Sequence, residues 1–130
     1  MLVVGLAWID LPRDEVFDYV IETLGKINAK LRHADRTHYR IEGKSATATT
    51  GFTFPFEIWL KTYLKTNTLI EILAPLDRQF VNSCIMEFTK SMIPVQEPVI
   101  TEVESIEQIE RQIEQYKQQT DVMNKEAEKK

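Results

Sequence analysis

The spacing of apolar residues changes several times along the chain, and each change predicts a new structural element. Residues 2–9 are apolar in both alternating rows, which predicts a strand buried on both faces. Gly5 and Ala7 fall in the same row, and their small size would let a helix lie close to that side of the strand.

After Asp10 the apolar residues recur every three or four positions, which predicts an amphipathic helix over residues 12–32. Pro12 suits the first helical turn, and acidic residues follow it at the positive end of the helix dipole. Gly25 interrupts the pattern and is expected to mark a bend. The predicted apolar stripe consists of Val16, Val20, Leu24, Ile27 and Leu31, widened by Phe17 and Ile21.

The middle of the chain alternates apolar and polar residues and predicts a sheet. One strand is expected over residues 37–42, a turn at Gly43-Lys44, and a second strand over residues 45–50. The clearest strand pattern covers residues 52–64, and another strand is expected over residues 69–73. The inner row of the 52–64 strand consists of Phe52, Phe54, Phe56, Ile58 and Leu60.

A second helix is predicted after Pro75, with Asp77 as its N-cap. Its apolar face consists of Val81, Cys84, Ile85, Phe88 and Met92. Pro94 and Pro98 then break helicity twice within a short stretch, so residues 94–98 are expected to form a linker.

The final segment has the most specific pattern in the chain. Between residues 106 and 123 the apolar positions recur in steps of three and four, separated almost only by Glu, Gln, Lys and Arg. A helix with such a seam cannot bury it alone, so it must pack on another helix or on its own domain. The seam positions are Ile106, Ile109, Ile113, Tyr116, Thr120 and Met123.

Together these elements predict an α+β fold. The expected architecture is a two-layer sandwich of a mainly antiparallel five-strand sheet and two helices, followed by a C-terminal coiled-coil-like helix. The expected division is a sandwich domain over residues 1–93, a proline linker over residues 94–98 and an amphipathic helix over residues 99–130.

Composition and charge narrow the class of protein. Hydrophobic residues make up 43% and charged residues 28%, as in a soluble globular protein. The net charge of −4 argues against a nucleic-acid partner. The single cysteine, Cys84, excludes an internal disulfide and a cysteine-based zinc cluster. Because no segment has the pattern of a membrane span or a secretion signal, the expected location is the cytoplasm.

Candidate chemistry is sparse. His33 and His38, with Asp35 between them, could bind zinc or exchange protons, but their spacing across a helix end does not bring both rings onto one face. An acidic group at the start of the first helix is interpreted as dipole partners: Asp10, Asp14, Glu15 and Asp18. No nucleophile elbow or glycine-rich loop is present. The sequence therefore predicts no catalytic residue, no metal site, no cofactor and a protein that is not an enzyme.

One candidate binding surface is basic. Over residues 26–44 six bases stand against two acids, and Tyr39 lies among them, a combination that could contact phosphates. The alternative is a solvated helix end beside an edge strand. The bases are Lys26, Lys30, Arg32, Arg36, Arg40 and Lys44.

Two further candidates lie on the 52–64 strand. Trp59, Tyr63 and Lys61 share the outer row, where they form either a surface-binding patch or the floor of a second covering layer. The inner row could instead line a pocket for a small apolar ligand, although a packed core is the commoner outcome. The ligand-lining candidates are Phe52, Phe54, Phe56 and Ile58.

Two resemblances bear on the fold. Residues 9–17, Ile-Asp-Leu-Pro-Arg-Asp-Glu-Val-Phe, resemble the strand-to-helix opening of START-like helix-grip proteins, which bind lipids. Most of residues 2–92 also resembles small uncharacterised bacterial α+β domains, a resemblance that implies the sandwich fold and a single domain but no activity. It rests on Asp35, the stretch Tyr39-Arg40-Ile41-Glu42-Gly43-Lys44, and Asp77 followed by Asn82, Ile85 and Phe88.

These features favour a non-enzymatic binding or assembly module. We expect it to oligomerise or to dock a partner protein through its C-terminal helix. Two alternatives stay open: a carrier for a small hydrophobic, lipid-like ligand, and nucleic-acid or anion binding through residues 26–44. The expected oligomer or partner contacts are Ile106, Ile109, Ile113, Tyr116 and Met123.

Overall fold

The computed structural model describes most of the chain. The described residues are 2–27, 29–46, 53–64, 66–75 and 77–103, together with Glu107, Glu110, Arg111 and Glu114. The elements in chain order are β1 (Leu2–Ile9), α1 (Arg13–Lys26), β2 (Lys30–Asp35), β3 (Arg40–Ala46), β4 (Thr53–Leu64), β5 (Asn67–Pro75), α2 (Arg78–Ser91) and β6 (Val99–Val103).

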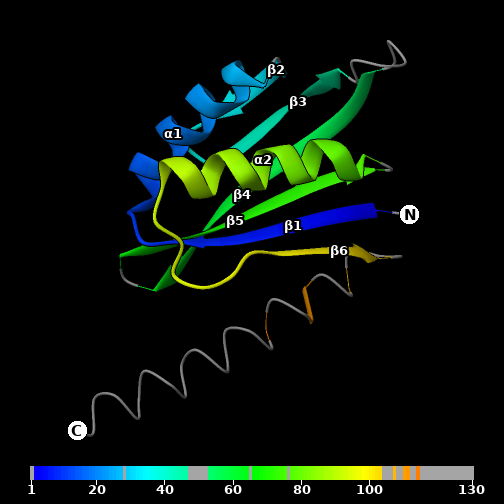
Figure 1. Cartoon of the computed structure of the whole chain (residues 1–130). Helices are drawn as coiled ribbons and strands as arrows, with labels where there is room; N and C mark the ends of the chain where they lie inside the picture. The colour runs from blue at the N-terminus through cyan, green and yellow to red at the C-terminus, as the bar shows by residue number, and fades with distance from the viewer. Residues whose placement is uncertain are drawn as a thin grey trace, which may run out of the picture.

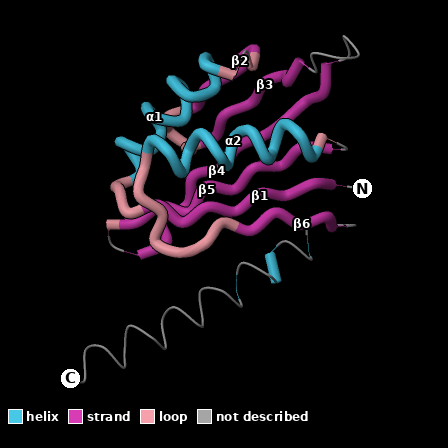
Figure 2. The backbone as a smooth tube through the Cα atoms, viewed as in Figure 1, coloured by secondary structure: helices cyan, strands magenta, loops and turns pink. Residues whose placement is uncertain are grey.

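The strands form a single six-stranded sheet in the order β2-β3-β4-β5-β1-β6, and every neighbouring pair is antiparallel. Both α1 and α2 lie on the same face of this sheet (Figure 1), which we call the near face. Figure 2 shows the same two layers as a tube, with β1 running inside the sheet between β5 and β6. The α+β class, the antiparallel sheet and the two helices are confirmed.

The near face is packed by a continuous apolar core between the sheet and the helices. Side chains on the near-face rows of β1, β4 and β5 interlock with the apolar stripes of α1 and α2. The core includes Ala7, Leu24, Phe56, Ile58, Ile72, Val81 and Phe88. Phe56, Ile58 and Leu60 of the expected inner row of β4 therefore belong to this core.

The opposite face of the sheet, which we call the far face, is also apolar over β1 and β5. A second buried cluster lies there, separate from the first. Its buried members are Val4, Leu6, Trp8, Tyr63, Leu69, Leu73 and Val103. A sheet with two apolar faces explains why both rows of β1 are hydrophobic.

The first helix is shorter than the sequence predicts. α1 ends at Lys26, where the N–H groups of Ile27 and Ala29 donate to the carbonyls of Thr23 and Leu24. Residues 30–35 form β2 instead of a last helical turn, because pairing with β3 satisfies their backbone groups in the sheet. Leu31, expected on the helical stripe, is 42% exposed on this strand.

The turn expected at Gly43-Lys44 is wrong. β3 runs unbroken from Arg40 to Ala46, and Gly43 lies in its middle. A Cβ at Gly43 would lie 2.4 Å from the carbonyl oxygen of Lys30 and 2.7 Å from Cζ of Phe56. The glycine is therefore needed for close packing and not for a turn. The actual turn lies between β2 and β3, where Tyr39 has φ 54.

The five-strand prediction misses β6. Residues 99–103, which the sequence reading placed at the start of the C-terminal helix, pair with β1 along its open side. Pro94 forms an isolated bridge with Ile9, and the Val95 N–H donates to the carbonyl oxygen of Trp8 at 2.6 Å. Residues 94–98 thus lead the chain along the sheet into a sixth strand.

The start of α2 is capped as predicted. Oδ1 of Asp77 accepts from the Phe80 N–H at 3.0 Å, and Oδ2 accepts from Oγ of Ser45 at 2.5 Å. Among the residues placed in the structure, no helix is long and apolar enough to cross a membrane.

Candidate functional site

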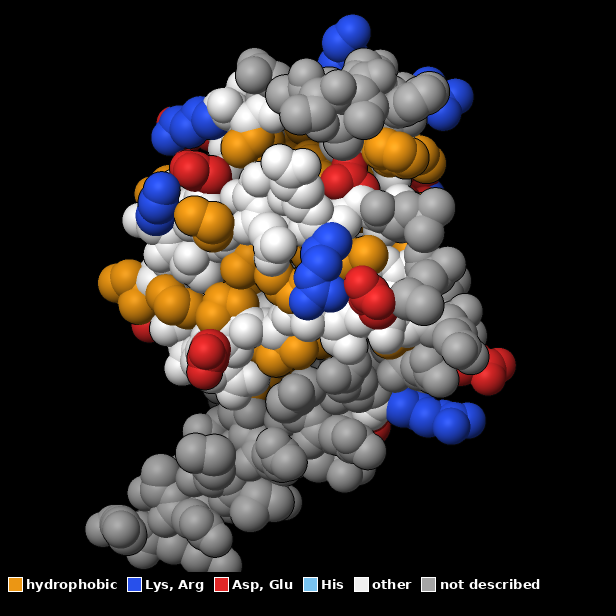
Figure 3. Space-filling view, turned by 45° about the vertical axis from the view of Figure 1, so that its right-hand side comes forward, with side chains coloured by type: hydrophobic (Ala, Val, Ile, Leu, Met, Phe, Trp, Pro, Cys, Tyr) orange, Lys and Arg blue, Asp and Glu red, His pale blue; other side chains and the backbone are white. Residues whose placement is uncertain are grey.

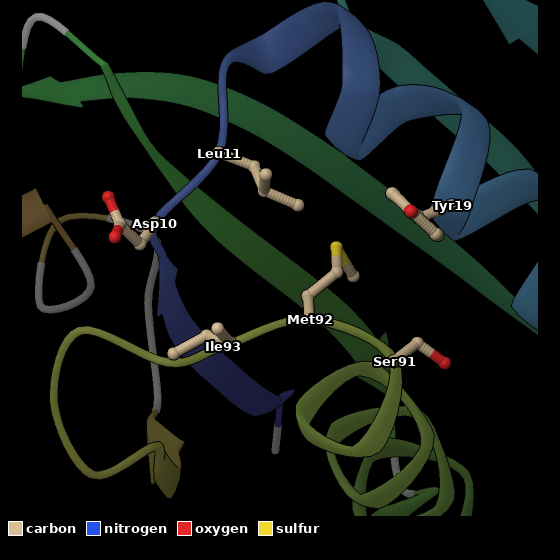
Figure 4. Close-up of a pocket in the computed structure, with 6 residues that line it drawn as sticks. All are labelled: Asp10, Leu11, Tyr19, Ser91, Met92 and Ile93. Carbon is tan, nitrogen blue, oxygen red and sulfur yellow. The ribbon is translucent and has the colours of Figure 1, made fainter.

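A small notch opens where the end of β1 meets the end of α2. It is lined by Asp10, Leu11, Tyr19, Ser91, Met92 and Ile93 and has a volume of about 190 Å³. The side chains of Leu11, Met92 and Tyr19 point toward one another across it (Figure 4). The lining thus joins the β1–α1 connection and Tyr19 of α1 to the end of α2, which is far from both in the sequence.

Backbone hydrogen bonds fix the geometry of the notch. The Asp10 N–H donates to the carbonyl oxygen of Ile93 at 3.0 Å, which ties the segment after α2 to the end of β1. The Met92 N–H donates to the Phe88 carbonyl oxygen at 2.8 Å and closes the last turn of α2. The Asp10 carboxylate accepts from Nδ2 of Asn67 at 2.6 Å, which anchors the same corner to β5. The notch is therefore built on hydrogen-bonded backbone.

The notch has a buried floor and an exposed apolar rim. Met92 is 3% exposed, whereas Tyr19 is 40% and Ile93 75% exposed. Small-molecule pockets usually enclose about 300–1,000 Å³. At about 190 Å³ this notch is below that range and suits a single apolar side chain of a larger partner.

The two histidines lie outside the notch. His33 is exposed on β2, and His38 is in the turn that follows. Nδ1 of His38 lies 2.6 Å from Oδ2 of Asp35, whose other oxygen accepts from the Thr37 and His38 N–H groups. The hydrogen bond from His38 holds the pKa of Asp35 below its ordinary value. This geometry is that of a capped turn.

The basic residues expected to bind anions divide into two groups. Three are neutralised by neighbours: Lys26 by Glu22, Arg36 by Asp18, and Arg40 by Glu42 and Glu57. The hydrogen bond to Glu57 raises the pKa of Arg40.

The other three bases are Lys30, Arg32 and Lys44, and no ion pair joins them to an acid within the described ranges. Lys30 lies directly opposite Lys44 in the β2–β3 register. On the surface seen in Figure 3, positive and negative side chains are interspersed. The free cations therefore form a small group at the sheet edge and not a broad basic surface.

The outer row of β4 lies on the far face. Trp59 is half-buried, its Nε1 donates to Oε2 of Glu57 at 3.2 Å, and the Arg40 guanidinium lies 5.0 Å from its ring centroid. Tyr63 is 9% exposed and packs edge-on against Trp8, with ring centroids 6.1 Å apart. These aromatic side chains are thus partly or wholly covered.

Lys61, the third residue of this expected patch, faces a buried acid. Its Nζ lies 2.8 Å from Oε2 of Glu71, whose side chain is 5% exposed against 40% for that of Lys61. The ion pair stands at the boundary between the apolar and charged halves of the far face.

The expected ligand-lining residues are mostly packed. Phe56 and Ile58 are buried in the near-face core, where Phe56 lies 4.6 Å, centroid to centroid, from the ring of Phe80. Phe54 is half-buried, and Phe52 lies outside the described residues.

The C-terminal contact residues Ile106, Ile109, Ile113, Tyr116 and Met123 also lie outside the described residues. Glu107, Glu110, Arg111 and Glu114 are described, and each is helical and exposed. Within the described part of the chain, no group of three or more His, Cys, Asp or Glu residues could hold a metal ion.

Sequence reasoning did not find the notch. Its two halves are about 75 residues apart, and no motif links Leu11 and Tyr19 to Met92. The one sequence feature that points to the notch is Ile93, an aliphatic residue between the end of the predicted second helix and Pro94.

Comparisons with known proteins find similarity in fold. No family model matches the chain, and no curated protein matches it. A similar solved structure is the crystal structure of the adenylate sensor from AMP-activated protein kinase in complex with 5-aminoimidazole-4-carboxamide 1-beta-D-ribofuranotide (ZMP). The match has a TM-score of 0.52 and 12% sequence identity, and it covers 64% of this chain and 91% of that chain. At this identity the likeness shows the fold alone.

Proposed function

We propose that this protein is a non-enzymatic binding module that takes an apolar side chain of a protein partner into the notch. The observation that carries the proposal is the exposure of Ile93, which is 75% exposed at the mouth while Met92 is buried at the floor. A large aliphatic side chain left in water beside a shaped recess is typical of a contact surface.

The construction of the notch supports this function. The hydrogen bonds from Asp10 to Ile93 and from Val95 to Trp8 hold the rim in place before any partner arrives. A preorganised site loses less conformational entropy on binding than a flexible one. Tyr19 adds an aromatic rim residue, a type enriched in the energetically important part of interfaces.

The polar groups of the notch do not form a reaction centre. The Asp10 carboxylate accepts a hydrogen bond from Asn67, and the other polar side chains of the lining are the hydroxyls of Tyr19 and Ser91. Neither histidine lines the recess. Acid–base or nucleophilic catalysis requires a base within hydrogen-bond reach of the reacting group, whereas the Asp10 carboxylate is engaged by the Asn67 side chain.

A peptide selection tests the proposal. Peptides selected from a random display library on the full chain should converge on one apolar anchor residue. A selected peptide should bind Ile93→Ser at least about tenfold more weakly by calorimetry, the effect of losing about 1.4 kcal/mol of contact.

Met86→Ser is the matched control, because Met86 is 58% exposed on α2 and does not line the notch. It should bind the peptide as the parent does. Equal affinity of the parent and Ile93→Ser, or an equal loss in both variants, would contradict the notch as the contact site.

Association through the C-terminal seam stays a second prediction. It is supported by the helical, exposed state of Glu107, Glu110, Arg111 and Glu114, the polar residues that stand between the seam positions in the sequence. If the seam joins copies of the chain, Ile109→Asp combined with Ile113→Asp should convert an oligomer to a monomer in light scattering. An unchanged mass would place the seam within its own chain.

A further inference from the structure

Most charged side chains on the two helices that border the notch already have a partner of opposite charge. The ion pairs on α1 and near the end of α2 are Asp18 with Arg36, Glu22 with Lys26, and Glu87 with Lys90. The guanidinium of Arg13 lies 3.6 Å from the ring centroid of Tyr39, whose hydroxyl donates to Asp14 at 2.9 Å. The charges of Arg13 and Asp14 therefore lie together at Tyr39, which does not line the notch.

Two carboxylates at the notch have no cation beside them. Asp10 lines the notch and is exposed, and its side chain accepts a hydrogen bond only from the neutral Asn67 amide among the described residues. Glu15 is exposed and forms no ion pair within the part of the chain that the structure describes. It follows Leu11 by four residues and precedes Tyr19 by four, so its side chain lies one helical turn from Tyr19 on the same side of α1.

These two carboxylates border different parts of the recess. Figure 4 shows Asp10 and Tyr19 at opposite ends of the notch, with Leu11 and Met92 between them. Because Glu15 lies beside Tyr19, negative charge is present at both ends of an apolar centre.

The ends of the helices do not cancel this charge. Ser91, the last residue of α2, lines the notch together with Met92, so the carbonyl end of that helix adds a partial negative charge there. The start of α1 contributes an opposite partial charge of about half a unit. That contribution is smaller than the charge of Asp10 and Glu15 together. The notch is thus an apolar recess with a negative border.

We propose that the partner segment of the notch is basic, with Lys or Arg close in sequence to the apolar anchor residue. This inference rests on the proposed function, and it adds the chemistry of the partner. The anchor enters the recess between Leu11 and Met92, and the neighbouring cation reaches Glu15 or Asp10. The long stem of Lys or Arg can pack along the ring of Tyr19 while its charged end stays in water.

The negative border also determines which partners are excluded. An apolar anchor with acidic neighbours would bring like charges together at Glu15 and Asp10, and such contacts weaken binding. Attraction between opposite charges at an exposed border mainly accelerates association and is screened by salt. Apolar contact thus holds the anchor, and charge selects the sequence around it.

Peptides selected on the full chain provide the test. Lys or Arg should be enriched next to their common apolar anchor. Glu15→Gln should weaken the binding of such a peptide about two- to fivefold by calorimetry, as expected for an exposed ion pair. The affinity of the parent protein should fall as salt is added, and that of Glu15→Gln should fall less.

Glu102→Gln is the matched control, because it changes the net charge by the same amount at a distant site. Glu102 is exposed on β6 and pairs with Val3 near the start of β1, whereas Asp10 follows the end of that strand. This variant should bind the peptide as the parent does.

A charge reversal tests the contact directly. Glu15→Lys should bind the basic peptide more weakly than Glu15→Gln does. It should bind more tightly a version of the peptide in which Glu replaces the basic residue. Equal affinity of Glu15→Lys for the two peptides would overturn the proposal.

Failure of this inference and failure of the proposed function give different results. Peptides that have an apolar anchor without basic neighbours, and that bind Glu15→Gln as tightly as the parent, would overturn the basic partner. The proposed function would stand in that case if Ile93→Ser still weakens binding. Equal losses in Glu15→Gln and Glu102→Gln would overturn the inference as well, because net charge alone would then explain them. A library that yields no converging peptide would overturn both.

Discussion

Gly5 of β1 lies directly beneath Val81 of α2. A Cβ at Gly5 would be 2.6 Å from Cγ1 of Val81, closer than packed carbon atoms can approach, and 3.3 Å from Cγ1 of Ile85, a tight contact. The small residue expected to let a helix lie near β1 is therefore in contact with that helix. The distance between α2 and the sheet depends on the missing side chain.

Gly5→Ala should destabilise the protein. The added methyl group forces α2 or the Val81 side chain to move, and such overpacking costs about 1–3 kcal/mol. Urea unfolding followed by circular dichroism measures the change in the free energy of unfolding.

Gly25→Ala is the matched control for Gly5→Ala. Gly25 lies inside α1, where an added Cβ meets nothing within 4 Å. Because alanine favours helix more than glycine does, this variant should gain about 0.5–1 kcal/mol. Similar losses in both variants would contradict the packing argument.

Asp77→Ala should cost about 1–3 kcal/mol of stability. The substitution removes the cap of α2 and the shorter hydrogen bond of the buried Ser45 hydroxyl, which keeps only the Phe54 carbonyl oxygen, at 3.3 Å, as an acceptor. Asp77→Asn keeps an acceptor for the Phe80 N–H and should cost less. Chemical denaturation of the two variants provides the measurement, and an equal cost would argue against the capping interaction as the source of the effect.

The Asp35–His38 contact should give stability that depends on pH at the acidic end. The pKa of Asp35 is held below its ordinary value of 3.8, mainly by the hydrogen bond from His38. The contact therefore stabilises the folded state above about pH 3.8, and this contribution is lost as the pH falls through the lowered pKa. His38→Ala should raise the pKa of Asp35, as an NMR titration of its carboxyl carbon would show. An unchanged titration would exclude His38 as the cause.

Cys84 should be unreactive in the folded protein. Burial raises the pKa of its thiol, and the negative charge of Asp77 raises it further, so little thiolate forms at pH 8. Labelling with a disulfide reagent should be slow in buffer and fast in denaturant. Met86→Cys provides the exposed comparison, because residue 86 is 58% exposed, and its added thiol should react at once.

The pattern of the chain predicted most of the core but not every boundary. Alternation in β1 and β4 and the stripes of both helices indicate burial directly, because each depends on the periodicity of one element. β2 was missed because Lys30 and Arg32 are charged and Leu31 continues a helical spacing, so nothing local distinguishes an exposed edge strand from a helix end.

Interactions between distant segments account for the other differences. Gly43 has the local signature of a turn, and only the approach of Lys30 and Phe56 shows its structural role. β6 follows two prolines and gains its strand conformation by pairing with β1. The notch likewise exists only after α2 returns to the end of β1, so no sequence window contains it.

The outer edge of β2 shows how the open end of this sheet is protected. Its ladder with β3 shifts register between Leu31 and His33, and its cations Lys30 and Arg32 are exposed beside the irregularity. A strand from another molecule that paired with this edge would meet an irregular row of backbone hydrogen-bonding groups and the exposed positive charges of Lys30 and Arg32. Growth of the sheet into fibrils from this side is therefore disfavoured, and concentrated solutions of the folded protein should resist amyloid formation through it.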